Sequence, residues 1–222
     1  MQQVWRNLTF LHWRYDAASI ARTLPAGLTL DTFDGSAWLG LVPFVLAGVR
    51  PYGFPALPWI SEFPETNVRT YVKGADGQPG VWFFTLEADR LVAVILARTW
   101  YHLPYRWAAM DAERSGSRVE YRSRRNRAFG QGSTDIGIEI GDAIETKELD
   151  HFLTARFRLY AEARGRIAYA QIEHVDWPLH QARITQLDET LMEHSGVTRP
   201  IGEPLVHFSE ELVVKAGALQ WM

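Results

Sequence analysis

Apolar and polar residues alternate with a period of two along much of this chain, which predicts many short strands. The clearest alternation runs through residues 118–124 and 135–141, because successive side chains of a strand point to opposite faces. Less regular apolar runs predict further strands at residues 28–33, 36–44, 67–72, 81–86, 157–160, 167–174, 180–184 and 202–214. The Asp34-Gly35 pair is a turn signal between the first two of these runs.

Only three segments have helical features. Residues 16–24 form a short predicted helix that Asp16 caps. Residues 90–99 are compatible with a strand or a helix, and their alanines favour a helix that is broken by the proline at position 104. Residues 147–153 predict another short helix, with Thr146 as its cap.

Many strands and few helices indicate a β-barrel or a sandwich with peripheral helices. The chain shows no internal repeat, low-complexity tract or linker, so a single domain over residues 1–222 is the simplest organisation. Residues 50–64 carry four prolines among aromatic residues. This composition predicts an irregular loop, and loops of this length often border a functional site.

Composition narrows the possible functions. The chain has 222 residues, of which 47% are hydrophobic, and this is enough for a substantial core. A net charge of -3 argues against general attraction to nucleic acids or membranes. No apolar run is long enough to span a membrane and no secretory signal is apparent, so we expect a cytoplasmic protein. The absence of cysteine excludes disulfides and thiol chemistry.

Metal and cofactor motifs are not found. Seven histidines are scattered without a recognised metal-binding spacing. Glu173, His174 and His180 form a conceivable metal site, but we expect surface or hydrogen-bonded histidines and no metal. The chain has no phosphate-binding loop, and we expect no cofactor. An arginine cluster within residues 118–127 fits either an anionic partner or a solvated strand face, and we expect the latter.

The segment 97–108, with the sequence ARTWYHLPYRWA, carries the most specific motif. It resembles the active-site segment of the acetoacetate decarboxylases, which reads Gly-Arg-Glu, then an aromatic residue, then Pro-Lys-Lys. In that family the first lysine forms a Schiff base with the keto-acid substrate. Tyr105 and Arg106 stand where the two lysines would be. Because a tyrosine cannot form an imine, the resemblance implies a pocket without its nucleophile.

Longer phrases extend the resemblance over most of the chain. They are FDGSAW at 33–38, FPETNVRTY at 63–71, FLTARFRLY at 152–160 and WPL at 177–179. These phrases are similar to the YqjF-like bacterial proteins, a family related to the acetoacetate decarboxylases. The resemblance implies a mainly β protein with flanking helices, built as a closed antiparallel β-barrel. It also implies a homo-oligomer, because the decarboxylases form oligomers.

The resemblance carries several site residues over to this chain. One of the two pocket glutamates of the decarboxylases aligns with Glu65, whereas the other falls near Gly40. The implied catalytic residues are Tyr105 and Glu65. The implied substrate-binding residues are Arg6, Arg98, Arg106, Asn67 and Arg69.

These residue types fit a small carboxylate or carbonyl ligand. Arginines bind carboxylates through two parallel hydrogen bonds. Tyr105 beside cations would have its phenolate favoured, and with Glu65 it would serve as a general acid or base. Asn67 and Arg69 share one strand face with Glu65, which lines either a polar interior or a solvated surface. The resemblance favours the interior.

Two functions follow from this pattern. One is the binding, and conversion by acid–base chemistry, of a small carboxylate or carbonyl compound. Such an enzyme would be lyase-like or hydrolase-like, not a Schiff-base decarboxylase, since only three lysines occur against twenty arginines. The other is a non-catalytic ligand-binding or structural protein, in which Arg6, Glu65 and Arg98 form a structural ion-pair network.

Overall fold

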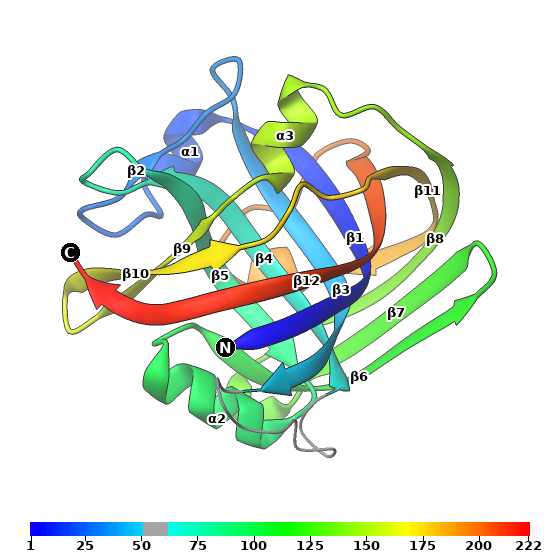
Figure 1. The fold of residues 1–222 in the computed structure, drawn as a ribbon, viewed down its shortest axis with the longest axis horizontal. Coiled ribbons are helices and arrows are strands. Elements are labelled where there is room, and N and C mark those ends of the chain that lie inside the picture. The colour runs from blue at the N-terminus through cyan, green and yellow to red at the C-terminus, as the bar shows by residue number, and fades with distance from the viewer. Residues whose placement is uncertain (51–61) are drawn as a thin grey trace.

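The computed structural model describes residues 1–50 and 62–222, and a twelve-stranded sheet dominates this part of the chain (Figure 1). The strands are β1 (Gln2–Tyr15), β2 (Thr29–Leu30), β3 (Ala37–Arg50), β4 (Glu62–Lys73), β5 (Pro79–Ala88), β6 (Tyr105–Ser115), β7 (Arg118–Arg125), β8 (Ser133–Ala143), β9 (Arg158–Ala163), β10 (Arg166–Glu173), β11 (His180–Glu189) and β12 (Leu205–Trp221). The helices are α1 (Ala17–Ala21), α2 (Leu91–Trp100), the 3₁₀ helix η1 (Arg127–Phe129), α3 (Glu148–Thr154) and α4 (Leu191–His194). Most of the loop expected at 50–64 lies outside the described residues.

The sheet curls around its own interior. Its strand order is β10-β9-β5-β6-β7-β8-β11-β12-β1-β3-β4-β2, and β5 also pairs with β4 while β12 also pairs with β10. Helix α2 lies at the lower end of Figure 1, and α1 and α3 lie near the upper end. The prediction of a mainly β protein is therefore confirmed. The expectation of antiparallel pairing is wrong at two places, because β5 runs parallel to β6 and to β9. The single domain stays a prediction.

Both faces of the central strands are buried. On β4, Val68 belongs to a core cluster with Leu11, Leu39 and Ile136. The intervening residues of β4 point to the opposite face, since strand side chains alternate. This second face carries Glu65 and its neighbours, and the functional site develops there.

The predicted helices are present, with one wrong cap. Asp16 caps α1 by accepting a 2.7 Å hydrogen bond from the backbone nitrogen of Ser19. The ambiguous segment 90–99 is helical, as α2. The cap of α3 is Lys147 and not Thr146, because the carboxylate of Asp150 accepts from the Lys147 nitrogen at 2.9 Å.

The Asp34-Gly35 turn is also present. Phe33 and Ser36 exchange two backbone hydrogen bonds across it, and both turn residues have positive φ angles, 50° and 73°. However, β2 pairs with β4 and not with β3 across the turn. Two long strands, β1 and β6, were not predicted from the sequence pattern.

Candidate functional site

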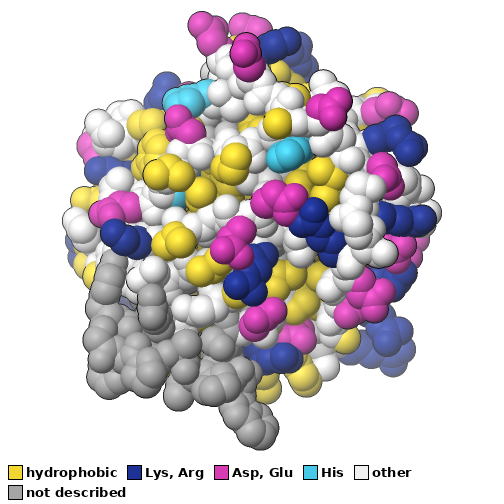
Figure 2. All heavy atoms as spheres, turned by 45° about the vertical axis from the view of Figure 1, so that its right-hand side comes forward, with side chains coloured by type: hydrophobic (Ala, Val, Ile, Leu, Met, Phe, Trp, Pro, Cys, Tyr) yellow, Lys and Arg dark blue, Asp and Glu magenta, His cyan; other side chains and the backbone are white. Residues whose placement is uncertain are grey.

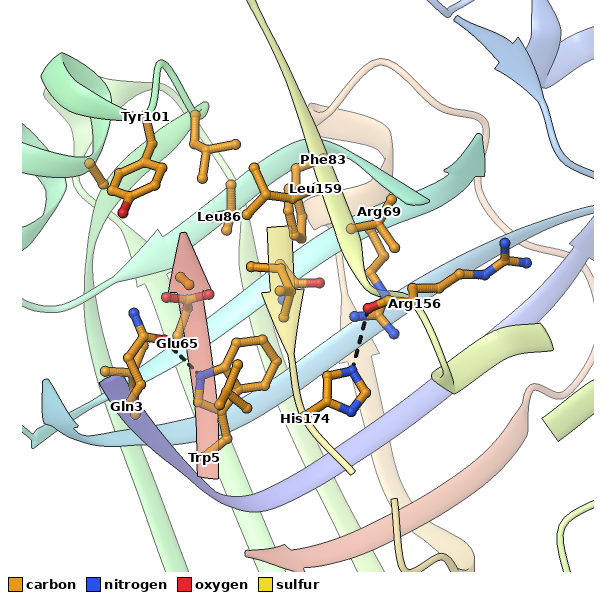
Figure 3. A pocket seen from close by; sticks show the side chains of 18 of the residues that line it. Gln3, Trp5, Glu65, Arg69, Phe83, Leu86, Tyr101, Arg156, Leu159 and His174 are labelled. Carbon is orange, nitrogen blue, oxygen red and sulfur yellow. Dashed lines mark hydrogen bonds between the residues drawn. The ribbon is translucent and has the colours of Figure 1, made fainter. Parts of the chain in front are cut away.

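A cavity of about 110 Å³ lies between strands β1, β4, β5, β9, β10 and β12 and the end of α2 (Figure 3). Its walls are largely apolar, and its polar members include Gln3, Glu65, Asn67 and Arg69. Three of these come from β4, so the inward orientation that the resemblance favours is what the structure shows. A cavity of this order holds a molecule of a few non-hydrogen atoms, since an engineered cavity of roughly 150 Å³ binds benzene.

Glu65 and Tyr105 form a hydrogen-bonded pair in the cavity wall. The Tyr105 hydroxyl donates to Oε2 of Glu65 at 2.8 Å. Burial raises the pKa of Glu65 to about 8, against the hydrogen bonds from Tyr105 and Asn67, which lower it. Glu65 is therefore mostly protonated at neutral pH, and it changes protonation state within the physiological range.

Tyr105 is a phenol and not the phenolate expected from the sequence. Burial raises the pKa of Tyr105 well above its usual value, and the Glu65 charge and hydrogen bond raise it further. The expectation failed because the partner of Tyr105 is a carboxyl group and not a cation. The hydroxyl consequently acts as a hydrogen-bond donor that orients Glu65.

Arg69 is a buried cation without a carboxylate partner. Its residue is 6% exposed, and its Nη2 donates to the Leu153 carbonyl oxygen at 3.3 Å. No carboxylate forms an ion pair with it among residues 1–50 and 62–222, whereas the neighbouring Arg156 pairs with Asp31 at 2.7 Å. Nε of Arg69 is buried without a hydrogen-bond acceptor in the same residues. The guanidinium lies 5.4 Å from the ring centre of Phe10 and 5.9 Å from that of Tyr71, so Arg69 brings to the cavity wall a positive charge that aromatic rings cover without a balancing anion among the described residues.

Arg6 does not reach the cavity. Its side chain is 44% exposed and pairs with Glu211 at 2.6 Å. Asn7 adopts a left-handed conformation with φ of 47°, and this interrupts the alternation of β1. Trp5 therefore lines the cavity before the interruption, Leu8 is buried after it, and Arg6 points outward.

Arg98 and Arg106 also lie outside the cavity. Arg98 is exposed on α2, where its Nη1 donates to the backbone oxygen of Tyr105 at 2.9 Å. Arg106 follows Tyr105 on β6, so strand alternation turns it to the other face, in register with Glu87. Burial and the charges of two other arginines, Arg125 and then Arg98, lower its pKa.

Position 40, near which the resemblance places the second decarboxylase glutamate, has little room for a side chain. A Cβ atom at Gly40 would lie 3.1 Å from the ring of His12. His12 is fully buried, and its Nε2 lies 2.6 Å from the Tyr71 hydroxyl. Burial, Arg69 and His207 lower the pKa of His12 well below its usual value. A neutral imidazole therefore fills the space that a side chain at position 40 would need.

Sequence reasoning missed part of the cavity wall. Gln3 and Trp5 from β1, and His174 and Trp177 from the segment around the end of β10, also line it. The rings of Trp5 and Trp177 are 5.9 Å apart, and those of His174 and Trp177 are 5.2 Å apart. The WPL phrase contains Trp177, but its pattern indicates no position relative to the cavity.

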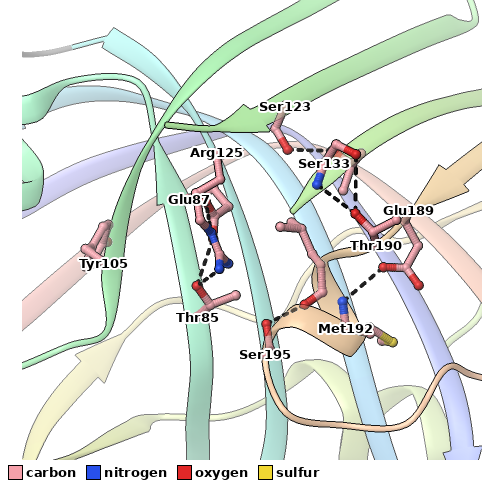
Figure 4. A network of polar contacts seen from close by, with 12 residues as sticks. Thr85, Glu87, Tyr105, Ser123, Arg125, Ser133, Glu189, Thr190, Met192 and Ser195 are labelled. Carbon is pink, nitrogen blue, oxygen red and sulfur yellow. Dashed lines mark hydrogen bonds and ion pairs between the residues drawn. The ribbon is translucent and has the colours of Figure 1, made fainter. Parts of the chain in front are cut away.

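A second buried polar group joins β5 to β7, the strands on either side of β6 (Figure 4). Arg125 forms an ion pair with Glu87 at 2.6 Å, and Thr85 donates to the same carboxylate at 2.8 Å. Arg125 is thus buried, although the sequence placed it on a solvated basic face. Its charge is matched within the protein, so this group has the character of a structural network.

The other arginines of that cluster behave as expected for a solvated face. Arg118 and Arg122 both pair with Glu120, at 3.2 and 2.5 Å, on the surface of β7. Figure 2, in which the right-hand side of Figure 1 comes forward, shows acidic and basic side chains interspersed on this side of the molecule. This face shows no continuous basic patch.

Within the described residues, no group of three or more histidine, aspartate or glutamate side chains is placed to hold a metal ion. None of the helices in the same part of the chain is long and apolar enough to cross a membrane.

Solved structures with this fold belong to the acetoacetate-decarboxylase-like class. The enduracididine biosynthesis enzyme MppR, complexed with pyruvate, matches with a TM-score of 0.68 at 13% identity, over 99% of this chain and 89% of that one. An acetoacetate-decarboxylase-like enzyme from Sphingomonas wittichii RW1 matches with a TM-score of 0.67 at 13% identity, over 100% and 92%. Acetoacetate decarboxylase from Legionella pneumophila matches with a TM-score of 0.63 at 10% identity, over 98% and 86%. At these identities the likeness shows the fold.

The sequence relatives define the family. Residues 2–213 match DUF2071, a family described as an uncharacterized conserved protein. YqjF of Bacillus subtilis (strain 168) is 37% identical over 215 residues, which are 95% of this chain and 88% of that protein. The chain therefore belongs to the DUF2071 family, and the predicted membership among the YqjF-like proteins is confirmed, while its fold is that of the acetoacetate-decarboxylase-like structures.

Proposed function

We propose that this protein binds a small carboxylate in the cavity, with Arg69 as the anchor of the carboxylate group. The observation that carries the proposal is the buried guanidinium of Arg69 without an anionic partner among the described residues. An unpaired buried charge is costly, and a ligand carboxylate would supply the missing anion. A guanidinium also fits a carboxylate geometrically, through two parallel hydrogen bonds.

The proposed chemistry is acid–base catalysis by Glu65, which Tyr105 orients. A carboxyl group with a pKa of about 8 exchanges a proton readily near neutral pH. Imine formation is not part of the proposal, because no lysine is found among the described residues that line the cavity. A proton transfer next to a ligand carbonyl, as in a lyase, requires no covalent intermediate with the protein.

The fold class supports this ligand size. The MppR structure carries pyruvate, a carboxylate with an adjacent carbonyl group. We further propose that the sheet closes around the cavity as a barrel, since the additional β4–β5 and β10–β12 pairings join strands that are distant in the sheet order. The homo-oligomer expected from the resemblance stays a prediction.

The second candidate function is binding without conversion. The observation in its favour is Tyr105 at the position that the resemblance assigns to the Schiff-base lysine. In this case the same ligands bind, but no product forms.

A thermal-shift screen tests the proposed function. Small carboxylates, oxo acids and their methyl esters would be compared on the wild type, on Arg69→Met and on Arg6→Met. Arg6→Met is the matched control, since it removes an exposed arginine outside the cavity. We expect the acids and not the esters to raise the melting temperature, because a ligand that binds only the folded state stabilises it. The shift should vanish in Arg69→Met and persist in Arg6→Met.

Two results would contradict the proposal. One is the absence of any shift with the wild type across the whole panel. The other is an equal shift in Arg69→Met. For each ligand that binds, a search for reaction products separates an enzyme from a binding protein.

A further inference from the structure

We infer that Gln3 recognises a carbonyl oxygen of the ligand, at the end of the cavity opposite Arg69. The inference rests on the proposed function, and it narrows the ligand from small carboxylates in general to oxo acids. No motif of the sequence pointed to Gln3.

The amide of Gln3 is buried and fixed in orientation. The residue is 8% exposed and lines the cavity. Its Oε1 accepts a 2.8 Å hydrogen bond from the indole Nε1 of Trp5. The Trp5 ring is itself held between the rings of Phe44 at 4.7 Å and Trp177 at 5.9 Å. Because Oε1 is engaged, the Nε2 group of Gln3 faces away from the indole.

Gln3 and Glu65 lie at the same end of the cavity. Figure 3 shows the amide nitrogen of Gln3 turned toward the end where the Glu65 carboxyl and Tyr101 lie, whereas Arg69 and Arg156 lie at the other end. Glu65 and Arg69 are four residues apart on β4, which separates their Cα atoms by roughly 13 Å. None of the hydrogen bonds seen within residues 1–50 and 62–222 uses Nε2 of Gln3 as a donor. The nitrogen is available to a ligand.

The donors at this end match a carbonyl group. Nε2 of Gln3 donates and cannot accept. Glu65 accepts from Tyr105 at one carboxyl oxygen, so its protonated form can donate from the other. A carbonyl oxygen has two lone pairs and no hydrogen, and it satisfies both donors. A methylene group would leave both donors unpaired, which a buried site penalises.

Because Gln3 lies opposite Arg69, its contribution to ligand binding can be measured separately from that of Arg69. Arg69 binds the carboxylate that plain acids and oxo acids have in common. Gln3 contributes only where the ligand has an oxygen at the second position. Loss of Gln3 should consequently change the discrimination among ligands without weakening the binding of the plain acid.

The test measures dissociation constants for butanoate, 2-hydroxybutanoate and 2-oxobutanoate by calorimetry at pH 7. The variants are Gln3→Met, which keeps the length of the side chain without a donor, and Trp5→Phe, which removes the indole N–H that fixes the amide together with one ring of the indole. Gln181→Met, an exposed glutamine of β11, is the matched control. Near-ultraviolet circular dichroism establishes that each variant is folded.

We expect the wild type to prefer 2-oxobutanoate over butanoate by about tenfold, the equivalent of one or two hydrogen bonds. Gln3→Met should reduce this ratio by about 3- to 10-fold, because 2-oxobutanoate loses a hydrogen bond while butanoate no longer faces an unpaired Gln3 donor and binds at least as tightly. Trp5→Phe should reduce it in the same direction, and Gln181→Met should not.

Equal binding of the three ligands by the wild type would overturn the inference, as would an unchanged ratio in both Gln3→Met and Trp5→Phe. The proposed function would survive either result if Arg69→Met abolished butanoate binding. Failure of the wild type to bind any of the three ligands would count against both.

Discussion

Tyr105 and Glu65, forty positions apart in the chain, are joined by a 2.8 Å hydrogen bond in the wall of a buried cavity. Tyr105 begins β6, directly after the proline of the decarboxylase-like motif, and Glu65 lies on β4. The resemblance assigns the Schiff-base lysine to the position of Tyr105. The two side chains therefore form a hydrogen-bonded pair of weak acids in the cavity wall.

Glu65 should make the protein less stable as pH rises through the neutral range. Its folded-state pKa of about 8 lies above the usual 4.5, so the unfolded chain releases this proton first. The contribution of Glu65 to the free energy of unfolding is then constant below pH 4.5 and falls between 4.5 and 8. The size of the fall is on the order of a few kcal/mol, at about 1.4 kcal/mol for each pKa unit.

Urea denaturation from pH 5 to 8 measures this contribution. Glu65→Gln should flatten the pH dependence of the free energy of unfolding relative to the wild type. Glu62→Gln, which changes an exposed carboxylate on the same strand, should leave it unchanged. Parallel curves for the wild type and Glu65→Gln would show that Glu65 titrates normally.

Tyr105→Phe should raise the pKa of Glu65 further. The hydrogen bond from Tyr105 stabilises the ionised carboxylate and lowers its pKa against the effect of burial. Loss of this hydrogen bond leaves the effect of burial on the pKa of Glu65 less opposed. It also costs about 1 kcal/mol of folding stability. Carbon-13 NMR of the glutamate carboxyl groups, followed against pH, measures the change. A lower pKa in the variant would contradict the hydrogen bond that we describe.

Gly40→Ala should destabilise the protein by about 1–3 kcal/mol, the usual cost of overpacking a core. The added methyl group would lie 3.1 Å from the His12 ring. The double variant Gly40→Ala/His12→Ala should lose less stability than the sum of the two single variants, because the methyl group then fills space that His12 left. Thermal denaturation of the four proteins gives this coupling, and strict additivity would argue against the contact.

The strands that were predicted from the sequence differ in burial from a strand that was not predicted. The segments at 118–124 and 135–141 alternate visibly, and they became β7 and β8. In β1, six consecutive residues from Leu8 to Trp13 are buried, because the strand lies between two packed interiors. No period-two pattern survives in such a strand, so it was not predicted.

Strand alternation also predicted only part of the site. Glu65, Asn67 and Arg69 share one strand, and simple alternation placed them on one face. The outward turn of Arg6 depends on the left-handed residue Asn7, which local sequence does not reveal. The same interruption of β1 at Asn7 places Gln3 in the cavity and turns Arg6 away from it. Both orientations follow from the three-dimensional path of β1.

The buried ion pair of Arg125 and Glu87 gives a final prediction. Arg125→Met should destabilise the protein by about 3–5 kcal/mol, because it leaves the carboxylate of Glu87 buried and unpaired. Arg122→Met, which removes an exposed arginine from the same strand, should cost less than about 1 kcal/mol. Urea denaturation of the two variants compares them directly. Similar small losses for both would mean that Glu87 becomes protonated or hydrated at little cost. A loss confined to Arg125→Met would show instead that the buried ion pair between β5 and β7 stabilises the fold.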